Sequence, residues 1–256
     1  MSLSAIRRKR FTSGKQEEDK LIKFTALTEG AQISVSIPIH LTPSDFKHLD
    51  YSLDNGETWV VTDNVYNQGF NITVPALHIG HSVLFKGEGL TMAASASAGY
   101  NCQFTIRKGQ FNCSGNILSL LFGEDADEQD IPADYAFYRL FRYCSGLKSV
   151  PRLPSKVLKD WCYASMFESC TDIVESPLLP ALDLSRNSYQ YNTMFDGCTN
   201  LRKITMLATS VYYNSLSNWV RGVAATGVFV KNPAMTTLPT GNNGIPSGWT
   251  VEDYVG

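Results

Sequence analysis

The chain has 256 residues, of which 43% are apolar and 18% charged, and its formal net charge at pH 7 is −2. This length and apolar content suffice for one large hydrophobic core or two ordinary ones. The near-neutral charge argues against a nucleic-acid-binding protein. No apolar run approaches the roughly 18 residues of a membrane-spanning helix, so neither nucleic acid nor membrane insertion is expected.

Residues 1–23 are predicted to be an N-terminal anchoring segment. A basic cluster near its start, Arg7, Arg8, Lys9 and Arg10, is not followed by the apolar segment that a secretory signal peptide requires. We therefore expect no export through such a peptide. Four charges without interleaved aromatic residues give little support to nucleic-acid binding. The cluster is expected to dock onto a partner protein, the alternative being a solvated tail.

Residues 24–110 are predicted to form a β-sandwich of the jelly-roll or immunoglobulin-like kind. Short strands with turn signals between them favour such a module, and the expected strands are 33–37, 51–53, 58–60, 70–74, 82–85 and 103–106. Asn55-Gly56 predicts a tight hairpin between the second and third of these strands. His78 and His81 could begin a metal site, but no third ligand is evident, and surface histidines are the favoured interpretation.

The segment after this module contains a partial match to the later repeats and a run of acidic residues. Phe111-Asn-Cys113-Ser-Gly115 resembles a later F-x-x-C-S-G segment and is interpreted as a degenerate first repeat that caps the array. Residues 124–130 carry five carboxylates, which suggests calcium because hard oxygen ligands cluster in this way. The run lacks the turn glycine and distal glutamate of an EF-hand loop, so a solvated acidic loop is favoured.

Residues 111–217 are predicted to be a repeat domain, because one pattern occurs three times, at 137–154, 163–180 and 191–208. Repeats of about 20–50 residues are typical of solenoids, in which neighbouring units share one core. The repeated cysteines set a period of 26 to 28 residues. The matched positions are expected to form the core, and they are Phe141, Phe167 and Phe195, Cys144, Cys170 and Cys198, and Leu147, Ile173 and Leu201.

Each repeat is expected to contain a helical turn, a tight turn and a short strand. Phe141 and Cys144 are three residues apart, a spacing that places both on one side of a helical turn. The Ser-Gly, Thr-Asp or Thr-Asn after each cysteine favours a turn. Because the six cysteines include no C-x-x-C pair, the repeated ones are predicted to be buried free thiols rather than metal ligands or disulfides.

Aromatic residues of the repeats supply the candidate binding surface. Tyr163 and Tyr191 lie at matched positions and are interpreted as packing residues. Trp161, Tyr212 and Tyr213 lie outside the matched core positions and are the candidates for contacting a ligand. Residues 218–256, with Trp219 and Trp249, are predicted to be the C-terminal cap. The expected fold class is therefore α+β, mainly β, with a sandwich-like module before a short leucine-rich-repeat-like solenoid.

The sequence contains no nucleotide-binding or nucleophile motif, and all four histidines lie before the repeats. Because no catalytic carboxylate pair stands out either, we expect no enzymatic activity and no cofactor.

The pattern M-F-x-x-C-T-x-L/I-x-x-x-P-x-L-P resembles the BspA-like leucine-rich repeats, which occur in surface proteins of gut anaerobes and in tail proteins of their phages. The segments Tyr51–Trp59, Gly115–Gly123, Trp219–Asn232 and Gly244–Val251 are similar to segments that flank such repeats in phage tail-fibre-like proteins. The resemblance implies a virion tail protein that contacts a glycan or protein of the host surface. It also implies other tail proteins as partners and a homo-oligomer, for which a trimer is expected. The alternatives are a bacterial surface adhesin and, third, a polysaccharide depolymerase.

Overall fold

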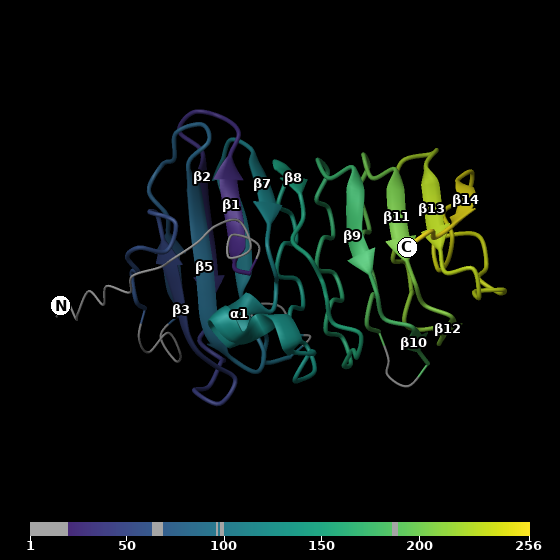
Figure 1. Cartoon of the computed structure of the whole chain (residues 1–256), viewed down its shortest axis with the longest axis horizontal. Helices are drawn as coiled ribbons and strands as arrows, with labels where there is room; N and C mark the ends of the chain where they lie inside the picture. Colours follow the sequence, from purple (N-terminus) through teal and green to yellow (C-terminus); the bar gives the residue numbers. More distant parts are fainter. Residues whose placement is uncertain (1–19, 63–68, 96, 98–99, 186–188) are drawn as a thin grey trace.

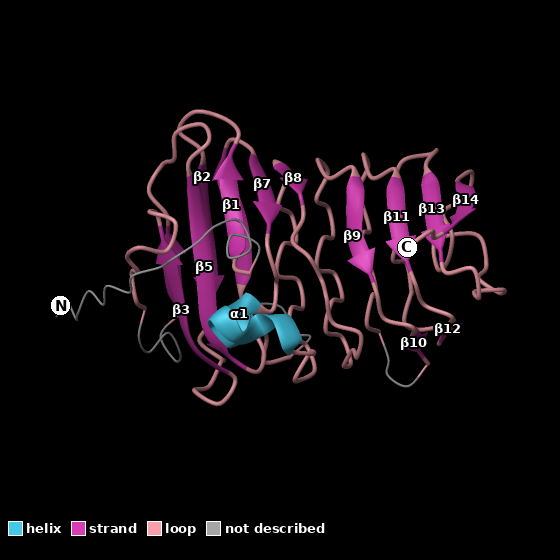
Figure 2. Cartoon of the chain, viewed as in Figure 1, coloured by secondary structure: helices cyan, strands magenta, loops and turns pink. Residues whose placement is uncertain are grey.

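The computed structural model describes residues 20–62, 69–95, 97, 100–185 and 189–256, and the fold is mainly β (Figures 1 and 2). Among these residues the only α-helix is α1 (Ser119–Phe122), which the 3₁₀ segment η1 (Gly123–Glu128) follows. A β-solenoid of about three turns lies toward the C-terminus. The predicted mainly-β class and the predicted solenoid are therefore confirmed.

The N-terminal part contains two sheets, a five-stranded sheet of order β3-β5-β1-β7-β8 and a three-stranded sheet of order β4-β2-β6. This arrangement confirms a β-rich module but does not confirm the expected jelly-roll. The strands are β1 (Ile22–Ala26), β2 (Gln32–Ile37), β3 (Phe46–Ser52), β4 (Phe70–Thr73), β5 (Ser82–Gly89), β6 (Gln103–Lys108), β7 (Phe111–Ser114) and β8 (Leu147–Ser149).

The predicted hairpin at Asn55-Gly56 forms only in part. Both residues have positive φ, 55° and 89°, as a tight turn of this type requires. Beyond the turn, Tyr51 and Val60 make a single antiparallel bridge. The long partner of β3 is instead β5, which pairs with it in antiparallel register.

Strand β7 joins the N-terminal part to the solenoid within one sheet. It pairs antiparallel with β1 and parallel with β8, which belongs to the first repeat. Phe111 lies opposite Leu147 in this pairing, so Phe111 occupies the strand position of a repeat. The interpretation of Phe111–Gly115 as a degenerate F-x-x-C unit is therefore wrong. Phe104 is the true counterpart of the repeated phenylalanines, since its ring stacks on Phe141 with centroids 5.3 Å apart.

The solenoid places short parallel strands side by side, in the order β14-β13-β11-β9 (Figure 1). A second ladder, β10-β12, is also parallel. Each strand recurs about one repeat later in the chain, as expected of coils that stack along one axis. The strands are β9 (Glu175–Leu179), β10 (Asp183–Leu184), β11 (Lys203–Met206), β12 (Ser210–Val211), β13 (Val228–Lys231) and β14 (Thr250–Asp253).

The predicted helical turns of the repeats are not helices. Nearly every fourth residue of these segments has a left-handed backbone, with φ between 48° and 74° in the first three copies. A left-handed residue ends α-helical propagation, because an L-amino acid has to leave the right-handed region to adopt it. We call the four segments 135–143, 161–169, 189–197 and 214–222 turn segments 1 to 4. Their left-handed residues are Tyr135, Arg139, Tyr143, Trp161, Ser165, Ser169, Tyr189, Thr193, Gly197, Asn218 and Gly222.

The backbone hydrogen bonds explain this conformation. Alternate N–H groups close tight turns within a segment, as Tyr138 does with the carbonyl of Tyr135 at 3.0 Å. The remaining N–H groups point sideways and donate to the next coil, as Phe137 does to Cys162 O at 2.9 Å. Nearly all of the N–H groups of turn segment 1 therefore have a backbone partner without an α-helix. A column of turn segments is thereby joined edge to edge, much as strands are in a sheet.

Turn segment 4 is a further copy of the repeat that the sequence pattern does not reveal. Tyr191 N donates to Ser215 O at 3.0 Å, and Phe195 N donates to Trp219 O at 2.8 Å, in the manner of the earlier coils. Trp219 is fully buried and stacks on Tyr191, so it belongs to this coil. Its indole N–H donates to Gly244 O at 2.8 Å, which joins the coil to the segment that follows it.

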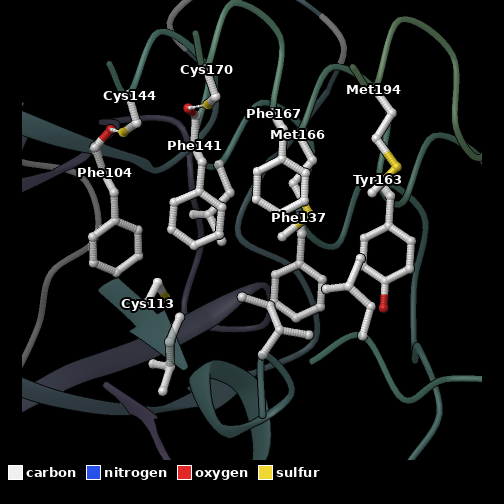
Figure 3. Packing of buried hydrophobic residues seen from close by; sticks show 14 of the residues in the cluster. Phe104, Cys113, Phe137, Phe141, Cys144, Tyr163, Met166, Phe167, Cys170 and Met194 are labelled. Atoms are coloured by element: carbon white, nitrogen blue, oxygen red, sulfur yellow. Dashed lines mark hydrogen bonds between the residues drawn. The ribbon is translucent and has the colours of Figure 1, made fainter. Parts of the chain in front are cut away.

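The core is one continuous cluster that runs through both parts of the molecule (Figure 3). The rings of Phe141, Phe167 and Phe195 stack in a column, with centroids 5.4 and 5.8 Å apart. A second column contains Phe137, Tyr163 and Tyr191, which confirms the two tyrosines as packing residues. All nine matched repeat positions are at most 1% exposed, and they are Phe141, Cys144, Leu147, Phe167, Cys170, Ile173, Phe195, Cys198 and Leu201.

Candidate binding surface on the turn segments

The outer side of the turn segments, which we call the turn face, follows from a four-residue pattern. Each turn buries its two middle residues and places its two outer residues on the turn face. In turn segment 1, Leu140 and Phe141 are fully buried, whereas Arg139 and Arg142 are partly exposed. In the next coils the middle residues are again buried, whereas the outer residues range from buried, as Ser165 is, to partly exposed, as Glu168 is. Side chains at equal positions form columns that cross from coil to coil.

One column is aromatic and contains the predicted site residue Trp161. Its ring stacks on Tyr189 with centroids 4.2 Å apart and on Tyr135 with centroids 6.2 Å apart. Both rings lie nearly parallel to the indole, at 15° and 20°. Trp161 also packs against a small buried cluster that includes Tyr138. Because neighbouring rings cover the indole faces, mainly the indole edge remains for a ligand.

The other two predicted site residues, Tyr212 and Tyr213, form an exposed pair. Their side chains are 39% and 73% exposed, and the ring centroids are 4.5 Å apart. A hydrogen bond with Tyr213 raises the pKa of Tyr212, and Tyr189 contributes to the same rise. The structure thus brings Tyr212 and Tyr213 together just before turn segment 4, whereas Trp161 belongs to the aromatic column with Tyr135 and Tyr189.

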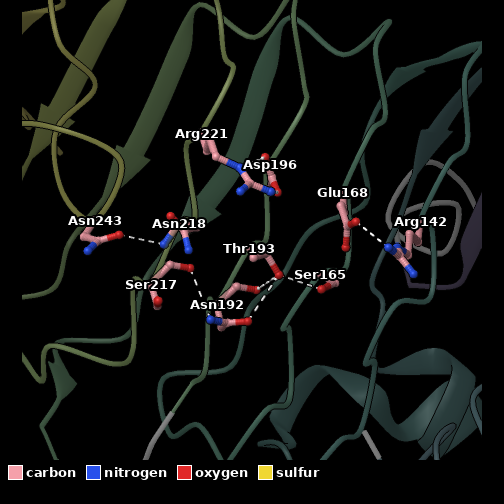
Figure 4. A network of polar contacts seen from close by, with 10 residues as sticks. All are labelled: Arg142, Ser165, Glu168, Asn192, Thr193, Asp196, Ser217, Asn218, Arg221 and Asn243. Carbon is pink, nitrogen blue, oxygen red and sulfur yellow. Dashed lines mark hydrogen bonds and ion pairs between the residues drawn. The ribbon is translucent and has the colours of Figure 1, made fainter. Parts of the chain in front are cut away.

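Two ion pairs cross between coils on the turn face (Figure 4). Arg142 Nη2 lies 2.5 Å from Glu168 Oε1, and Arg221 Nε donates to Asp196 Oδ1 at 3.0 Å. Arg221 also reaches the second oxygen of Asp196, so this pair is bidentate. Partial burial lowers the pKa of Arg142, but the hydrogen bond with Glu168, the charge of that carboxylate and the two nearby tyrosines together raise the pKa overall.

A neighbouring column is polar and uncharged (Figure 4). The hydroxyl groups of Ser165 and Thr193 are 2.6 Å apart, and Asn192 Nδ2 donates to Ser217 O at 3.2 Å. Asn218 N donates to Asn243 Oδ1 at 2.7 Å, which extends the column beyond turn segment 4. The turn face therefore combines hydrogen-bonding groups with aromatic rings over successive coils, a composition suited to binding sugars or proteins.

The carboxylates of the acidic run do not converge on one point. Glu124 pairs with Lys86 at 3.1 Å. Asp130 accepts hydrogen bonds from Ser155 Oγ at 2.8 Å and from the backbone N–H of Lys156 at 2.9 Å. Burial raises the pKa of Asp130, but these bonds outweigh it, and the net pKa is lowered. Among the residues that the structure describes, no group of three His, Cys, Asp or Glu could hold a metal ion, and the calcium hypothesis gains no support.

The six cysteines are buried free thiols, as predicted. Burial raises the pKa of Cys144 and of Cys162 to about 12, so neither is ionised near neutral pH. The repeated cysteines also bond to the preceding coil: Cys144 Sγ donates to Phe104 O at 3.0 Å, and Cys198 Sγ donates to Phe167 O at 3.0 Å. These thiols therefore hold neighbouring coils together rather than offering a reactive group.

The remaining predicted residues lie elsewhere. His78 pairs with Glu29 on the surface, and its ring lies 5.5 Å from that of His81. The basic cluster, Arg7, Arg8, Lys9 and Arg10, lies outside the described residues. The sequence analysis did not predict the ion pairs between coils. The pattern that could have revealed them is the alternation of two outer and two middle residues in each turn, as in W-C-Y-A-S-M-F-E (Trp161–Glu168).

Comparison with known proteins adds no relative: no family model, no curated protein and no solved structure matches the chain. No helix among the described residues has the length and apolar character needed to cross a membrane.

Proposed function

We propose that the chain is a structural and recognition protein of a phage tail, and that its turn face contacts the surface of the host cell. The observation that carries this proposal is the continuity of the turn face. The aromatic column crosses turn segments 1 to 3, and hydrogen bonds between side chains continue from turn segment 2 to turn segment 4. A broad, rigid surface of this kind suits recognition of an extended ligand better than chemistry on a small substrate.

The virion assignment rests on the resemblance of the repeats and their flanking segments to those of phage tail-fibre-like proteins. In this proposal the leucine-rich-repeat-like solenoid is the host-contacting end. The N-terminal segment with Arg7, Arg8, Lys9 and Arg10 docks onto other tail proteins, and the chain assembles as a trimer. A bacterial adhesin would use the same face, so the surface alone does not separate the two roles.

The test is to locate the chain on particles. An antibody against this chain should label the tails of purified phage in immuno-electron microscopy, and peptides of the chain should appear in the same particles by mass spectrometry. Label on bacterial cells without label on particles would replace the tail role with the adhesin. Cleavage of a host polysaccharide by the purified chain would instead support the depolymerase.

A second measurement tests the face. Binding of the purified chain to host cells should fall when Tyr212 and Tyr213 are both replaced by Ala, because the ring of Tyr213 is 73% exposed and lies beside that of Tyr212. Val174→Ala provides the control, since Val174 is 49% exposed but lies beside strand β9, outside the turn face. Equal binding by both variants and the parent chain would remove the tyrosine pair from the contact surface.

A further inference from the structure

Turn segment 1 carries a group of four adjacent side chains that we call the arginine–tyrosine cluster: Tyr138, Arg139, Arg142 and Tyr143. The Arg139 guanidinium lies 4.7 Å from the centre of the Tyr138 ring, and the Arg142 guanidinium lies 4.4 Å from that of Tyr143. Burial raises the pKa of Tyr138, and both arginines oppose that rise. Each arginine of the cluster is thus held against the ring of the tyrosine next to it in the chain.

The cluster carries one positive charge more than its neighbours neutralise. Arg142 is paired with Glu168, and Arg221, at the far end of the turn face, is paired with Asp196. Arg139 makes no ion pair with any carboxylate that the structure describes. Its stacking on Tyr138 holds the guanidinium in place without supplying an acceptor.

Two N–H donors of the cluster lack an acceptor. The Nε atoms of Arg139 and of Arg142 are both buried, and neither has a hydrogen-bond partner. Buried donors are nearly always paired in folded proteins, because an unpaired donor loses its hydration without compensation. Two such donors within four residues of one turn leave the polar groups of this cluster incompletely paired by the described residues.

The backbone conformation of turn segment 1 also distinguishes it from the later coils. Turn segment 1 has large side chains at all three of its left-handed positions, Tyr135, Arg139 and Tyr143, with φ of 58°, 58° and 63°. The positions that match Arg139 and Tyr143 in the later coils carry smaller residues, which include two glycines and an asparagine, namely Ser165, Ser169, Thr193, Gly197, Asn218 and Gly222. Glycine and asparagine adopt this conformation with less strain. Backbone strain of this kind concentrates at ligand-binding sites.

We infer that the arginine–tyrosine cluster binds the anionic group, a carboxylate or a sulfate, of an acidic polysaccharide. A guanidinium binds a pair of anionic oxygens through two parallel N–H donors, and Arg139 is free to do so. Tyr143 is 57% exposed and offers an aromatic surface to the sugar ring beside the charge. This inference rests on the proposed function, since it takes the ligand from a cell surface.

The experiment measures binding of the full chain to polygalacturonate by isothermal titration calorimetry at low ionic strength. Fully methyl-esterified polygalacturonate is the matched neutral probe, because it has the same backbone without the charge. Dextran sulfate, with dextran as its neutral control, shows whether sulfate replaces carboxylate. The variants are Arg139→Gln and Arg139→Lys, and the control is Arg202→Gln, which removes an exposed arginine beside strand β11, outside the turn face. Circular dichroism confirms that each variant is folded.

We expect binding to at least one acidic polymer and none to its neutral counterpart. Arg139→Gln should weaken binding about tenfold or more, as loss of a charge-assisted hydrogen bond predicts. Arg139→Lys should weaken it less, and Arg202→Gln should leave it unchanged. The inference is overturned if the parent chain ignores both acidic polymers, which would leave water as the acceptor. It is also overturned if Arg139→Gln and Arg202→Gln weaken binding equally, which would indicate non-specific attraction.

The two proposals fail separately. A chain that labels phage tails and binds host cells but ignores acidic polymers overturns the anion site and leaves the tail role. A chain that binds the polymers through Arg139 but is absent from particles overturns the tail role and leaves the site.

Discussion

The thiol of Cys170 donates a hydrogen bond to the backbone carbonyl oxygen of Phe141, 2.9 Å away and one coil earlier in the solenoid. Cys144 and Cys198 make the same contact with Phe104 and Phe167. The repeated F-x-x-C motif thus pairs each cysteine with the phenylalanine of the coil before it. This relation explains why cysteine recurs at a position where a plain apolar residue of similar size would also fill the space.

Replacing Cys170 with Ala should destabilise the protein by about 1–3 kcal/mol, because it removes a buried sulfur and its hydrogen bond. The matched control is Cys162→Ala. Cys162 is equally buried, but among the described residues its thiol makes no hydrogen bond to another coil of the kind that Cys170 makes to Phe141 O. Phe141 O also accepts from Cys144 N, so the carbonyl is not left unpaired. We therefore expect the two variants to differ by only about 0.5–1 kcal/mol in urea unfolding, with Cys170→Ala the less stable. A larger loss for Cys162→Ala would show that the thiol bond does not stabilise the coil junction.

Ser169 tests the left-handed backbone of the turn segments, since its φ is 59°. Ser169→Gly should leave the free energy of unfolding unchanged or raise it slightly, because glycine adopts this conformation without strain. Ser169→Val should lower it by about 1–2 kcal/mol, since a β-branched residue resists positive φ. Ser169 is partly exposed and its backbone N–H donates to Asp196 O, a bond that both variants keep.

The same pair of variants separates a left-handed turn from a helical one. In a helix, glycine would cost about 1 kcal/mol relative to alanine and valine would cost less. The two structures thus predict opposite orders of stability. Urea unfolding of both variants gives the order directly, and a chain in which Ser169→Gly is the weaker variant would contradict the left-handed assignment.

The repeat core could be predicted from sequence because identical residues at one period must occupy equivalent environments in stacked coils. This argument placed all nine matched positions correctly. The local conformation could not be predicted in the same way. A spacing of three residues between Phe141 and Cys144 fits a helical turn as well as a four-residue tight turn. Hydrogen bonds between coils, such as Phe141 N to Met166 O at 2.9 Å, decide between them, and the sequence does not display these bonds.

Turn segment 4 and the turn face could not be predicted from the sequence, for related reasons. Trp219 and Val223 stand where the earlier copies have Met and Cys, so no motif marks the fourth copy. The ion pairs of the turn face join residues 25 to 26 positions apart, as Arg142 with Glu168 and Asp196 with Arg221. Such pairs become visible only once the exact register between coils is known. For Trp161 the sequence indicated a free surface residue, because it lies outside the matched core positions. In the structure its ring is stacked between rings of two other coils.

Among the exposed and partly buried aromatic residues, Trp161 should stabilise the fold and Tyr213 should not. Trp161→Ala should destabilise the protein by about 1–3 kcal/mol, because it removes a partly buried ring that stacks on Tyr189 and packs beside Tyr138. Tyr213→Ala should change stability by less than about 0.5 kcal/mol, because its side chain is 73% exposed. Thermal and urea unfolding of the two variants measure this difference. Equal losses would show that the exposed tyrosine also supports the fold.

His48 should make stability depend on pH. The Nδ1 atom of His48 lies 3.2 Å from Asp50 Oδ1, and its Nε2 atom lies 3.6 Å from Glu88 Oε2. The other carboxylate oxygen of Glu88 pairs with Lys47. The hydrogen bond with Asp50 raises the pKa of His48 above its ordinary value near 6.5, although partial burial opposes the rise. The native state therefore keeps this proton to a higher pH than the unfolded chain does.

The stabilisation from this proton is fully present below the unfolded pKa and is lost as pH rises through the folded pKa. We expect the free energy of unfolding to fall as pH rises across the window just above pH 6.5. His48→Gln removes the titrating group, and the difference in slope between parent and variant isolates the contribution of His48 from that of the other titrating residues. Urea unfolding in a buffer series from about pH 5.5 to about pH 8.5 provides the measurement. Parallel curves for parent and variant would show that the proton of His48 does not stabilise the native state.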